Sequence, residues 1–336
     1  MKASYLAKPG GSLKYGELPT PPVASETAKI NVLYCGVNHL DVLIRQGKRP
    51  GIPKFPHVLG SEVVGMIEEI QSKTKKFEIG DTVAVYPWTF CGKCKQCKSS
   101  NEQICDTGGT FGRTSWGGYA QYLITPIHNL IKLPQTLPLD GACALILAGT
   151  TAQHLVERAG VRKNQTVLVT GATGGVGTIV MQLVRNIGAT IIAATAHLEK
   201  SQRLKQLGAK YVVSVDSMVK DIDVIAPRGV SVVIDIVGGT IWSTALTTLA
   251  KGGRMVFCST SREEAGQVPI GMAFSRQWNI LGSYGGNRKH LKAILAKCRK
   301  GVVTPVIDAT FPLSDAPRAH EKIDSQNIFG KILLRP

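Results

Sequence analysis

The sequence predicts an α/β fold with two domains, one rich in β-strands and one built on a doubly wound parallel sheet. The chain has 336 residues, more than one ordinary core holds and enough for two domains of roughly 100–200 residues. Short β-branched runs separated by Gly and Pro continue to about Pro126, after which strand and helix periods alternate. An apolar fraction of 43% and 36 well-spread glycines are typical of such a protein.

The first part of the chain contains the predicted β-rich domain. Its strands are expected where apolar and β-branched residues recur between turn residues. These runs are KINVLYCGV at 29–37, EVVGMIEEI at 62–70, DTVAVYPW at 81–88 and YAQYLITP at 119–126.

The middle of the chain repeats a β-α-β-α order. Strands are expected at 166–172, 190–196, 211–216, 230–238 and 252–259, and helices at 178–188 and 200–209. This alternation predicts a parallel sheet with helices on both faces. A helix at 290–301 and a strand at 330–336 follow, and we expect them to return to the first domain.

Composition narrows the class of protein. Nothing resembles a signal peptide or a membrane span, so we expect a cytoplasmic protein with no membrane partner. A formal net charge of +17 suits anionic partners in general. The basic residues are scattered and no aromatic stacking platform accompanies them, so the charge does not by itself indicate a nucleic-acid partner.

A glycine turn marks a dinucleotide site. The run VLVTGATGGVGTIVMQL places glycines between a strand and a helix, where backbone can approach a pyrophosphate and free N–H groups can bind it. The spacing is GxxGxxG rather than GxGxxG. The residues predicted to bind the cofactor here are Gly171, Gly174, Gly175, Val176 and Gly177.

The end of the next strand indicates which cofactor is preferred. That strand ends in Thr195, with no acidic residue to bind the ribose 2′-hydroxyl of NAD. Lys200 and Arg203 follow and could pair with a 2′-phosphate, which favours NADP(H) over NAD(H). Alternatively, both are solvated residues at a helix start. Further cofactor contacts are expected where later strands end, at Val237, Gly238, Ser259 and Thr260.

A cysteine cluster predicts a metal site. Cys91, Cys94, Cys97 and Cys105 are separated by two, two and seven residues, a spacing that can place four thiolates round one tetrahedral ion. Four sulfurs leave no open position for substrate, so one structural Zn²⁺ per chain is expected. An iron–sulfur centre and metal-free thiols are the alternatives.

Together with GVNHLDVLIRQG, FPHVLGSEVVG, FEIGDTVAVYP, LAGTTAQ and DIVGG, these motifs make the whole chain similar to the medium-chain dehydrogenase/reductase superfamily. The resemblance implies a GroES-like catalytic domain of residues 1–147 and 285–336 with a zinc lobe at 88–110. It also implies a Rossmann NAD(P)-binding domain at 148–284 and a homodimer or homotetramer. It places Lys331, in NIFGKILL, where relatives close over the cofactor.

The chain departs from the zinc alcohol dehydrogenases at the catalytic metal. Their ligands come from GVC, GHE and CAGxT stretches, where this chain has Asn38, Ser61 and Leu147, and Leu40 fills the position of the proton-relaying Ser or Thr. Asn and Ser are poor zinc ligands and Leu is none, so a catalytic zinc is not expected.

The pattern GVNHLD is similar to the zinc-free quinone oxidoreductases, which implies reduction of quinones or conjugated carbonyl compounds as small-molecule substrates. Asn38 would donate to the acceptor oxygen, Asp41 would orient the loop and Thr151 would hold the nicotinamide. Glu62 is expected to be a buried structural carboxylate paired with a neighbour. His39 and His57 are possible proton donors.

Three alternatives remain open. One is an alcohol dehydrogenase that recruits zinc through other ligands. The second is an enoyl- or acryloyl-CoA reductase, whose anionic substrate would suit the basic charge. The third is not an enzyme but a dinucleotide-regulated RNA-binding protein, for which salt-dependent RNA affinity would be the signature.

Overall fold

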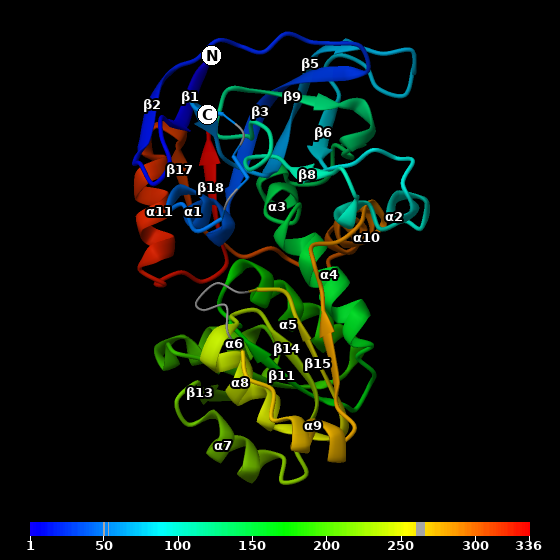
Figure 1. Cartoon of the computed structure of the whole chain (residues 1–336), viewed down its shortest axis with the longest axis vertical. Coiled ribbons are helices and arrows are strands. Elements are labelled where there is room, and N and C mark those ends of the chain that lie inside the picture. The colour runs from blue at the N-terminus through cyan, green and yellow to red at the C-terminus, as the bar shows by residue number, and fades with distance from the viewer. Residues whose placement is uncertain (50, 53, 260–265) are drawn as a thin grey trace. The chain divides into compact units, whose positions relative to one another are not determined.

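The computed structural model describes residues 1–49, 51–52, 54–259 and 266–336, and the chain divides into two compact units (Figure 1). Unit 1 consists of Met1–Leu147, Asn287–Arg299 and Pro305–Pro336. Unit 2 consists of Ala148–Gly286 and Lys300–Thr304.

Unit 1 is dominated by β-structure. Its largest sheet has the order β10-β6-β5-β3-β18-β17, with β9 also paired to β3. The neighbours β17 and β18 are parallel, and the other pairs are antiparallel. This sheet contains β3 (Thr27–Val37), β5 (Glu62–Gln71), β6 (Thr82–Val85), β9 (Tyr122–Pro126), β10 (Leu130–Lys132), β17 (Ile307–Pro312) and β18 (Lys331–Arg335).

Two smaller sheets complete the β-structure of unit 1. They have the orders β2-β1-β4 and β7-β8. Their strands are β1 (Lys2–Leu6), β2 (Leu13–Glu17), β4 (His57–Val58), β7 (Trp88–Thr89) and β8 (Gly109–Thr110). Alternation along β3 buries Ala28, Ile30 and Val32 in the core of the unit.

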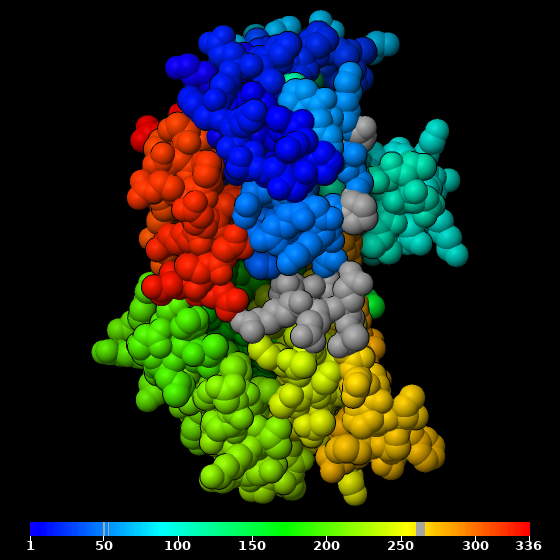
Figure 2. Space-filling model, turned by 60° about the vertical axis from the view of Figure 1, so that its left-hand side comes forward, coloured from blue at the N-terminus to red at the C-terminus, as the bar shows by residue number. Residues whose placement is uncertain are grey.

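The helices of unit 1 lie around these sheets. They are α1 (His39–Arg45), α2 (Lys95–Lys98), α3 (Leu139–Cys143), α10 (Arg288–Arg299) and α11 (Ala316–Asp324), with 3₁₀ turns at Glu102–Ile104, Ile127–Asn129 and Leu313–Asp315. Helix α11 packs against α1 and β18, so segments far apart in sequence lie side by side (Figures 1 and 2). The pairing of β18 with β3 sets Ile332 opposite Val37, which brings the start of β18 close to the start of α1.

Unit 2 is a six-stranded parallel sheet of order β13-β12-β11-β14-β15-β16. This is the doubly wound order: the chain adds β12 and β13 on one side of β11, and β14, β15 and β16 on the other, so the strand order reverses between β11 and β14. The strands are β11 (Thr166–Thr170), β12 (Thr190–Thr195), β13 (Ala209–Ser214), β14 (Val230–Asp235), β15 (Leu249–Phe257) and β16 (Asn279–Gly282).

Helices cover the sheet of unit 2. Helices α4 (Ala148–Ala159) and α5 (Gly175–Ile187) pack together against the central strands, and α7 (Met218–Ile225) and α8 (Gly239–Thr247) form a second pair. Helices α6 (Ser201–Gln206) and α9 (Ile270–Ser275) are shorter, and a 3₁₀ turn spans Leu198–Lys200. Helix α5 ends at Gly188, whose φ of 82° gives the left-handed cap that glycine favours.

The predicted fold class is confirmed: a β-rich unit and a doubly wound parallel sheet are both present. The short helices α1, α3 and α9 were not predicted, because five to seven residues are too few to show a helical period. In the described part of the chain, no helix combines the length and the hydropathy that crossing a bilayer requires.

Candidate active site and zinc lobe

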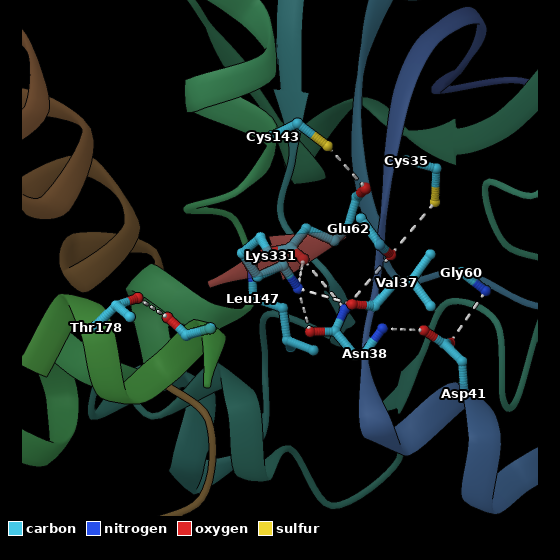
Figure 3. Close-up of polar contacts among 12 residues, drawn as sticks. Cys35, Val37, Asn38, Asp41, Gly60, Glu62, Cys143, Leu147, Thr178 and Lys331 are labelled. Atoms are coloured by element: carbon cyan, nitrogen blue, oxygen red, sulfur yellow. Dashed lines mark hydrogen bonds and ion pairs between the residues drawn. The ribbon is translucent and has the colours of Figure 1, made fainter. Parts of the chain in front are cut away.

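Glu62, at the start of β5, is the centre of a buried polar cluster in unit 1 (Figure 3). Its Oε1 accepts the Leu147 N–H at 2.8 Å, and its Oε2 lies 2.5 Å from the Lys331 Nζ and 3.1 Å from the Asn38 Nδ2. Gly36 makes room for this carboxylate, since a Cβ there would lie 2.2 Å from Oε2. The expectation that Glu62 is paired with a neighbour is confirmed, and Lys331 is that neighbour.

Lys331, the first residue of β18, donates to three acceptors. Besides Glu62 they are the Asn38 Oδ1 at 2.7 Å and the Val37 carbonyl at 3.0 Å (Figure 3). The side chain is 4% exposed, so the ammonium and the carboxylate form a buried ion pair. Such a pair is tolerated when hydrogen bonds complete both partners. All three acceptors belong to unit 1, and the cofactor role that the family implies for Lys331 stays a prediction.

The beginning of α1 is held by Asp41. One oxygen of its buried carboxylate accepts the Asn38 N–H at 2.8 Å and the other accepts the Gly60 N–H at 3.3 Å. Burial raises the pKa of Asp41 to about 6, against these hydrogen bonds, which lower it. Asp41 therefore holds the backbone of Asn38 in place.

A chain of hydrogen bonds links Asp41 to the surface. The Tyr119 hydroxyl lies 3.4 Å from the Asp41 carboxylate and 3.0 Å from the His320 Nε2. On the far side of the ring, the Arg45 Nε donates to the His320 Nδ1 at 3.2 Å, and the same guanidinium pairs with Asp324 at 2.8 Å. Because arginine only donates, His320 must carry its proton on Nε2. Sequence reasoning missed this chain, since Tyr119 and His320 are 201 residues apart.

The two possible proton donors, His57 and His39, differ in burial. His57 is 1% exposed, and burial lowers its pKa. His39 is exposed at the start of α1.

Cys35 and Cys143 are buried thiols outside the zinc lobe. Burial raises their pKa values, which agrees with an inert role. Cys143 donates to the Glu62 carbonyl at 3.3 Å (Figure 3).

In unit 2 the glycine turn connects β11 to α5. Gly174 is the N-cap of α5, and Gly175 and Val176 begin its first turn, where N–H groups have no partner within the helix. A Cβ on Gly177 would come within 2.2 Å of the Gly171 carbonyl, so only glycine lets the helix start this close to the strand. A close strand-to-helix turn with free N–H groups at the helix start is the backbone arrangement that a pyrophosphate site needs, and the cofactor role of these residues stays a prediction.

The ends of β11 and β14 are tied together at the switch point. The Thr170 hydroxyl donates to the Asp235 carboxylate at 2.5 Å, and the other carboxylate oxygen accepts the Gly238 N–H at 2.8 Å. Val237 lies in this turn. Asp235 is buried, and burial raises its pKa. The motif DIVGG predicts cofactor contacts at Val237 and Gly238, and the structure shows that Asp235 holds the turn that contains them.

The remaining predicted cofactor residues lie in unit 2 as well. Thr195 is buried at the end of β12, where its hydroxyl accepts the His197 N–H at 2.9 Å. Lys200 is 7% exposed, whereas Arg203 is exposed on α6. Thr151 is buried in α4, and Ser259 follows β15 half-buried. Thr260 lies outside the described residues.

The four predicted metal ligands come together in a lobe of unit 1 that projects in Figure 2 as the cyan segment. Their sulfurs lie within 4.8 Å of one another, with Cys91–Cys97 and Cys94–Cys105 separations of 4.0 and 3.9 Å. A tetrahedral zinc with Zn–S bonds of about 2.3 Å requires sulfurs about 3.8 Å apart. The thiols therefore fit zinc.

Backbone amides donate to two of these sulfurs and favour the thiolate form of Cys91, whereas burial raises the pKa of Cys97 to about 12. The Cys94 N–H donates to the Cys91 sulfur at 3.3 Å and the Cys97 N–H to the Cys94 sulfur at 3.5 Å. Backbone hydrogen bonds lower the pKa of Cys91 to about 6. Asn287, before α10, donates to the Ser100 carbonyl at 2.7 Å and ties the lobe to the rest of unit 1.

Comparison with known proteins agrees with this geometry. Residues 24–135 match the family model of the alcohol dehydrogenase GroES-like domain, and residues 175–300 match that of the zinc-binding dehydrogenases. An NAD-dependent alcohol dehydrogenase of Sulfolobus acidocaldarius is 30% identical over 100% of this chain and 99% of its own. An acryloyl-coenzyme A reductase of Sulfurisphaera tokodaii is 30% identical over 100% of both.

Solved structures give the same result. The crystal structure of an NAD-dependent alcohol dehydrogenase superposes with a TM-score of 0.94 at 30% identity, covering 100% of both chains. That of AibC superposes with a TM-score of 0.92 at 32% identity, covering 100% of this chain and 96% of that one. The chain belongs to the medium-chain dehydrogenase/reductase superfamily, with the zinc-type alcohol dehydrogenases as relatives, and is an oxidoreductase with a cysteine cluster for structural zinc.

Proposed function

We propose that the protein reduces quinones or conjugated carbonyl compounds by hydride transfer, without a catalytic metal. One observation carries this proposal: the Lys331 ammonium bonds to Glu62 and Asn38 at 2.5 and 2.7 Å. A cation already neutralises the buried carboxylate of the cluster. Alcohol oxidation needs a Lewis acid that lowers the pKa of the hydroxyl group, or a base that takes its proton. Reduction of a quinone or enone needs only orientation and a hydrogen bond to the acceptor oxygen.

The residues of the chain have separate roles in this proposal. NADPH, when bound at the glycine turn of unit 2, supplies the hydride. In unit 1, Asn38 donates its amide to the acceptor oxygen, and Asp41 holds the backbone of Asn38 through the 2.8 Å bond to its N–H. Thr151, on α4, would hold the nicotinamide.

NADPH preference is part of the proposal. It rests on the absence of a carboxylate at the end of β12 (TIIAAT) and on Lys200 and Arg203 in the following turns. Relatives are named as NAD-dependent enzymes, so the two cofactors have to be compared directly.

A second candidate is reduction of an enoyl thioester of coenzyme A. It is favoured by the net charge of +17, which suits a phosphorylated substrate, and by two acryloyl-coenzyme A reductases among the relatives. The chemistry at Asn38 would be the same, because a thioester carbonyl oxygen also gains charge when hydride adds to the conjugated alkene.

The proposal is tested by metal content and acceptor range together. Mass spectrometry on untagged protein should find about one tightly bound zinc per chain. NADPH oxidation should be seen with 1,4-naphthoquinone, methyl vinyl ketone or acryloyl-CoA, and Asn38→Leu should lower kcat by about 10- to 100-fold. Two zinc ions per chain with oxidation of simple alcohols would overturn the proposal.

A further inference from the structure

Both ends of the Asn38 amide are held by charged groups. Its Oδ1 accepts from the Lys331 ammonium at 2.7 Å, and its Nδ2 donates to the Glu62 carboxylate at 3.1 Å. A flipped amide would place N–H groups against the ammonium and an oxygen against the carboxylate. The ion pair therefore admits one orientation of Asn38.

One hydrogen of this amide is loosely held. The second Nδ2 hydrogen is directed at the Gly36 carbonyl, 3.5 Å away, at the limit of a hydrogen bond. By contrast, the Lys331 Nζ lies 2.5 to 3.0 Å from each of its three acceptor oxygens, so all three of its hydrogens are firmly bonded. Asn38 is half-buried, whereas Glu62 and Lys331 are 0% and 4% exposed. Among the polar hydrogens of this cluster, the second Nδ2 hydrogen is the one that an incoming oxygen reaches most readily.

We propose that Lys331 is a positioning residue that makes Asn38 a hydrogen-bond donor toward the acceptor, and that the site accordingly selects acceptors whose oxygen becomes anionic. This inference rests on the proposed function. When hydride adds to the β-carbon of an enone, the alkene electron pair shifts toward the carbonyl and the oxygen becomes an enolate. The Asn38 N–H stabilises that oxygen, and water then protonates the α-carbon.

Lys331 acts in this proposal through Asn38 and not on the substrate. Without the buried charges the amide has no reason to keep one orientation, and its oxygen would face the acceptor for part of the time. A carbonyl oxygen facing an enolate is repulsive, so the fraction of productive molecules falls. The cost should appear in kcat more than in KM, because the bond strengthens as charge develops.

The test uses variants that keep the cluster electrically balanced. Lys331→Met alone would leave Glu62 buried without a counter-ion, so the main variant is the neutral double substitution Lys331→Met with Glu62→Gln. Lys331→Arg keeps the cation and serves as the rescue. Lys322→Met removes a lysine from the partly buried pair with Asp308 in the same unit and serves as the control for loss of a lysine.

Three kinds of measurement are made on each full-length variant: steady-state kinetics (kcat and KM) with methyl vinyl ketone and naphthoquinone, the Kd of NADPH by fluorescence, and the ¹⁵N side-chain amide signal of Asn38. Asn38→Leu assigns that signal. The double variant should lose about tenfold or more in kcat, with the Kd of NADPH changed by less than about twofold. Its Asn38 amide should exchange faster with solvent. Lys331→Arg should recover most of kcat.

Two results would overturn the inference. If the double variant keeps its kcat, Lys331 does not position Asn38. If it loses NADPH affinity instead, Lys331 is a cofactor residue. Failure of the proposed function is distinguishable, since the wild type would then reduce none of the acceptors. In that case the Asn38 amide signal decides alone: slow exchange in the wild type and fast exchange in the double variant support positioning, and equal exchange overturns it.

Discussion

At the scale of single residues, His320 is notable because Arg45 fixes its tautomer and burial keeps it neutral. Burial, with a smaller contribution from the Arg45 charge, lowers the pKa of His320 to about 3. A base with a lowered pKa binds its proton more readily when the chain is unfolded. Its contribution to stability is therefore complete above pH 6.5 and is lost as the pH falls toward 3.

We predict that this histidine makes the protein sensitive to acid. His320→Gln can still accept from Arg45 and donate to Tyr119, but it does not titrate. Between pH 7 and pH 4.5, the wild type should lose about 2.7 kcal/mol more of its free energy of unfolding than His320→Gln does, because the pH falls about two units below the ordinary histidine pKa. Urea titrations at both pH values measure this, and His197→Gln is the control. Parallel pH profiles for wild type and His320→Gln would contradict it.

Lys200 is the residue through which the proposed NADP(H) preference can be tested. Lys200→Ala should weaken NADPH binding about tenfold, as loss of one charged hydrogen bond to phosphate would. NADH lacks the 2′-phosphate, and its Kd should change by less than about twofold. Fluorescence titration with both cofactors tests this, with Lys205→Ala on the same helix as control. Equal weakening of both cofactors, or none, would refute the NADP preference.

At the scale of elements, the zinc lobe is built from β7, α2, a 3₁₀ turn and β8, which are too short to be stable alone. Four sulfurs round one ion supply the missing stability. Cys94→Ser should therefore reduce bound zinc from about one per chain to nearly none and lower the melting temperature.

Turnover per folded molecule should survive this change, because the lobe does not contain Asn38 or the glycine turn. Metal analysis, calorimetry and activity on the same sample provide the measurement. Cys298→Ser, on α10, is the control for loss of a thiol. A selective loss of turnover with unchanged stability would show that the metal has a chemical role.

The elements differ in how well the sequence predicted them. The glycine turn and the cysteine lobe were found because their function depends on residues close in sequence. The Lys331 pairing was missed because its partner Asn38 is 293 residues away and the register of β18 against β3 brings them together. For the same reason no local signal indicated the Asp41–Tyr119–His320 chain. Roles assigned to Asn38, Asp41 and Thr151 stay predictions.

At the scale of the whole molecule, the resemblance to the family implies a homodimer or homotetramer, and unit 2 has a surface on which two copies could associate. Strand β16 is at the edge of the sheet, and within the described residues its sheet neighbour is β15 alone. On the preceding helix α9, Ile270 and Phe274 are 75% and 81% exposed. An open edge beside exposed apolar side chains favours pairing with a second copy.

This association can be measured by light scattering during gel filtration. The wild type should have at least twice the 36.0 kDa mass of the chain. Phe274→Asp should shift it toward the monomer, because a charge is costly in a buried apolar contact. Val224→Asp changes an equally exposed apolar residue on α7 and is the control. A monomeric wild type would exclude this association.

The position of Lys331 near the end of the chain has a consequence for the order in which the two units can fold. During translation Asn38 and Glu62 emerge early, whereas Lys331, whose charge balances Glu62, is added 269 residues after Glu62. The six strands of unit 2 follow one another in the chain and can pair during translation. Unit 2 is therefore expected to fold first. If it binds NADPH as proposed, nascent chains released before residue 331 should bind the nucleotide but lack the completed Glu62–Lys331 cluster.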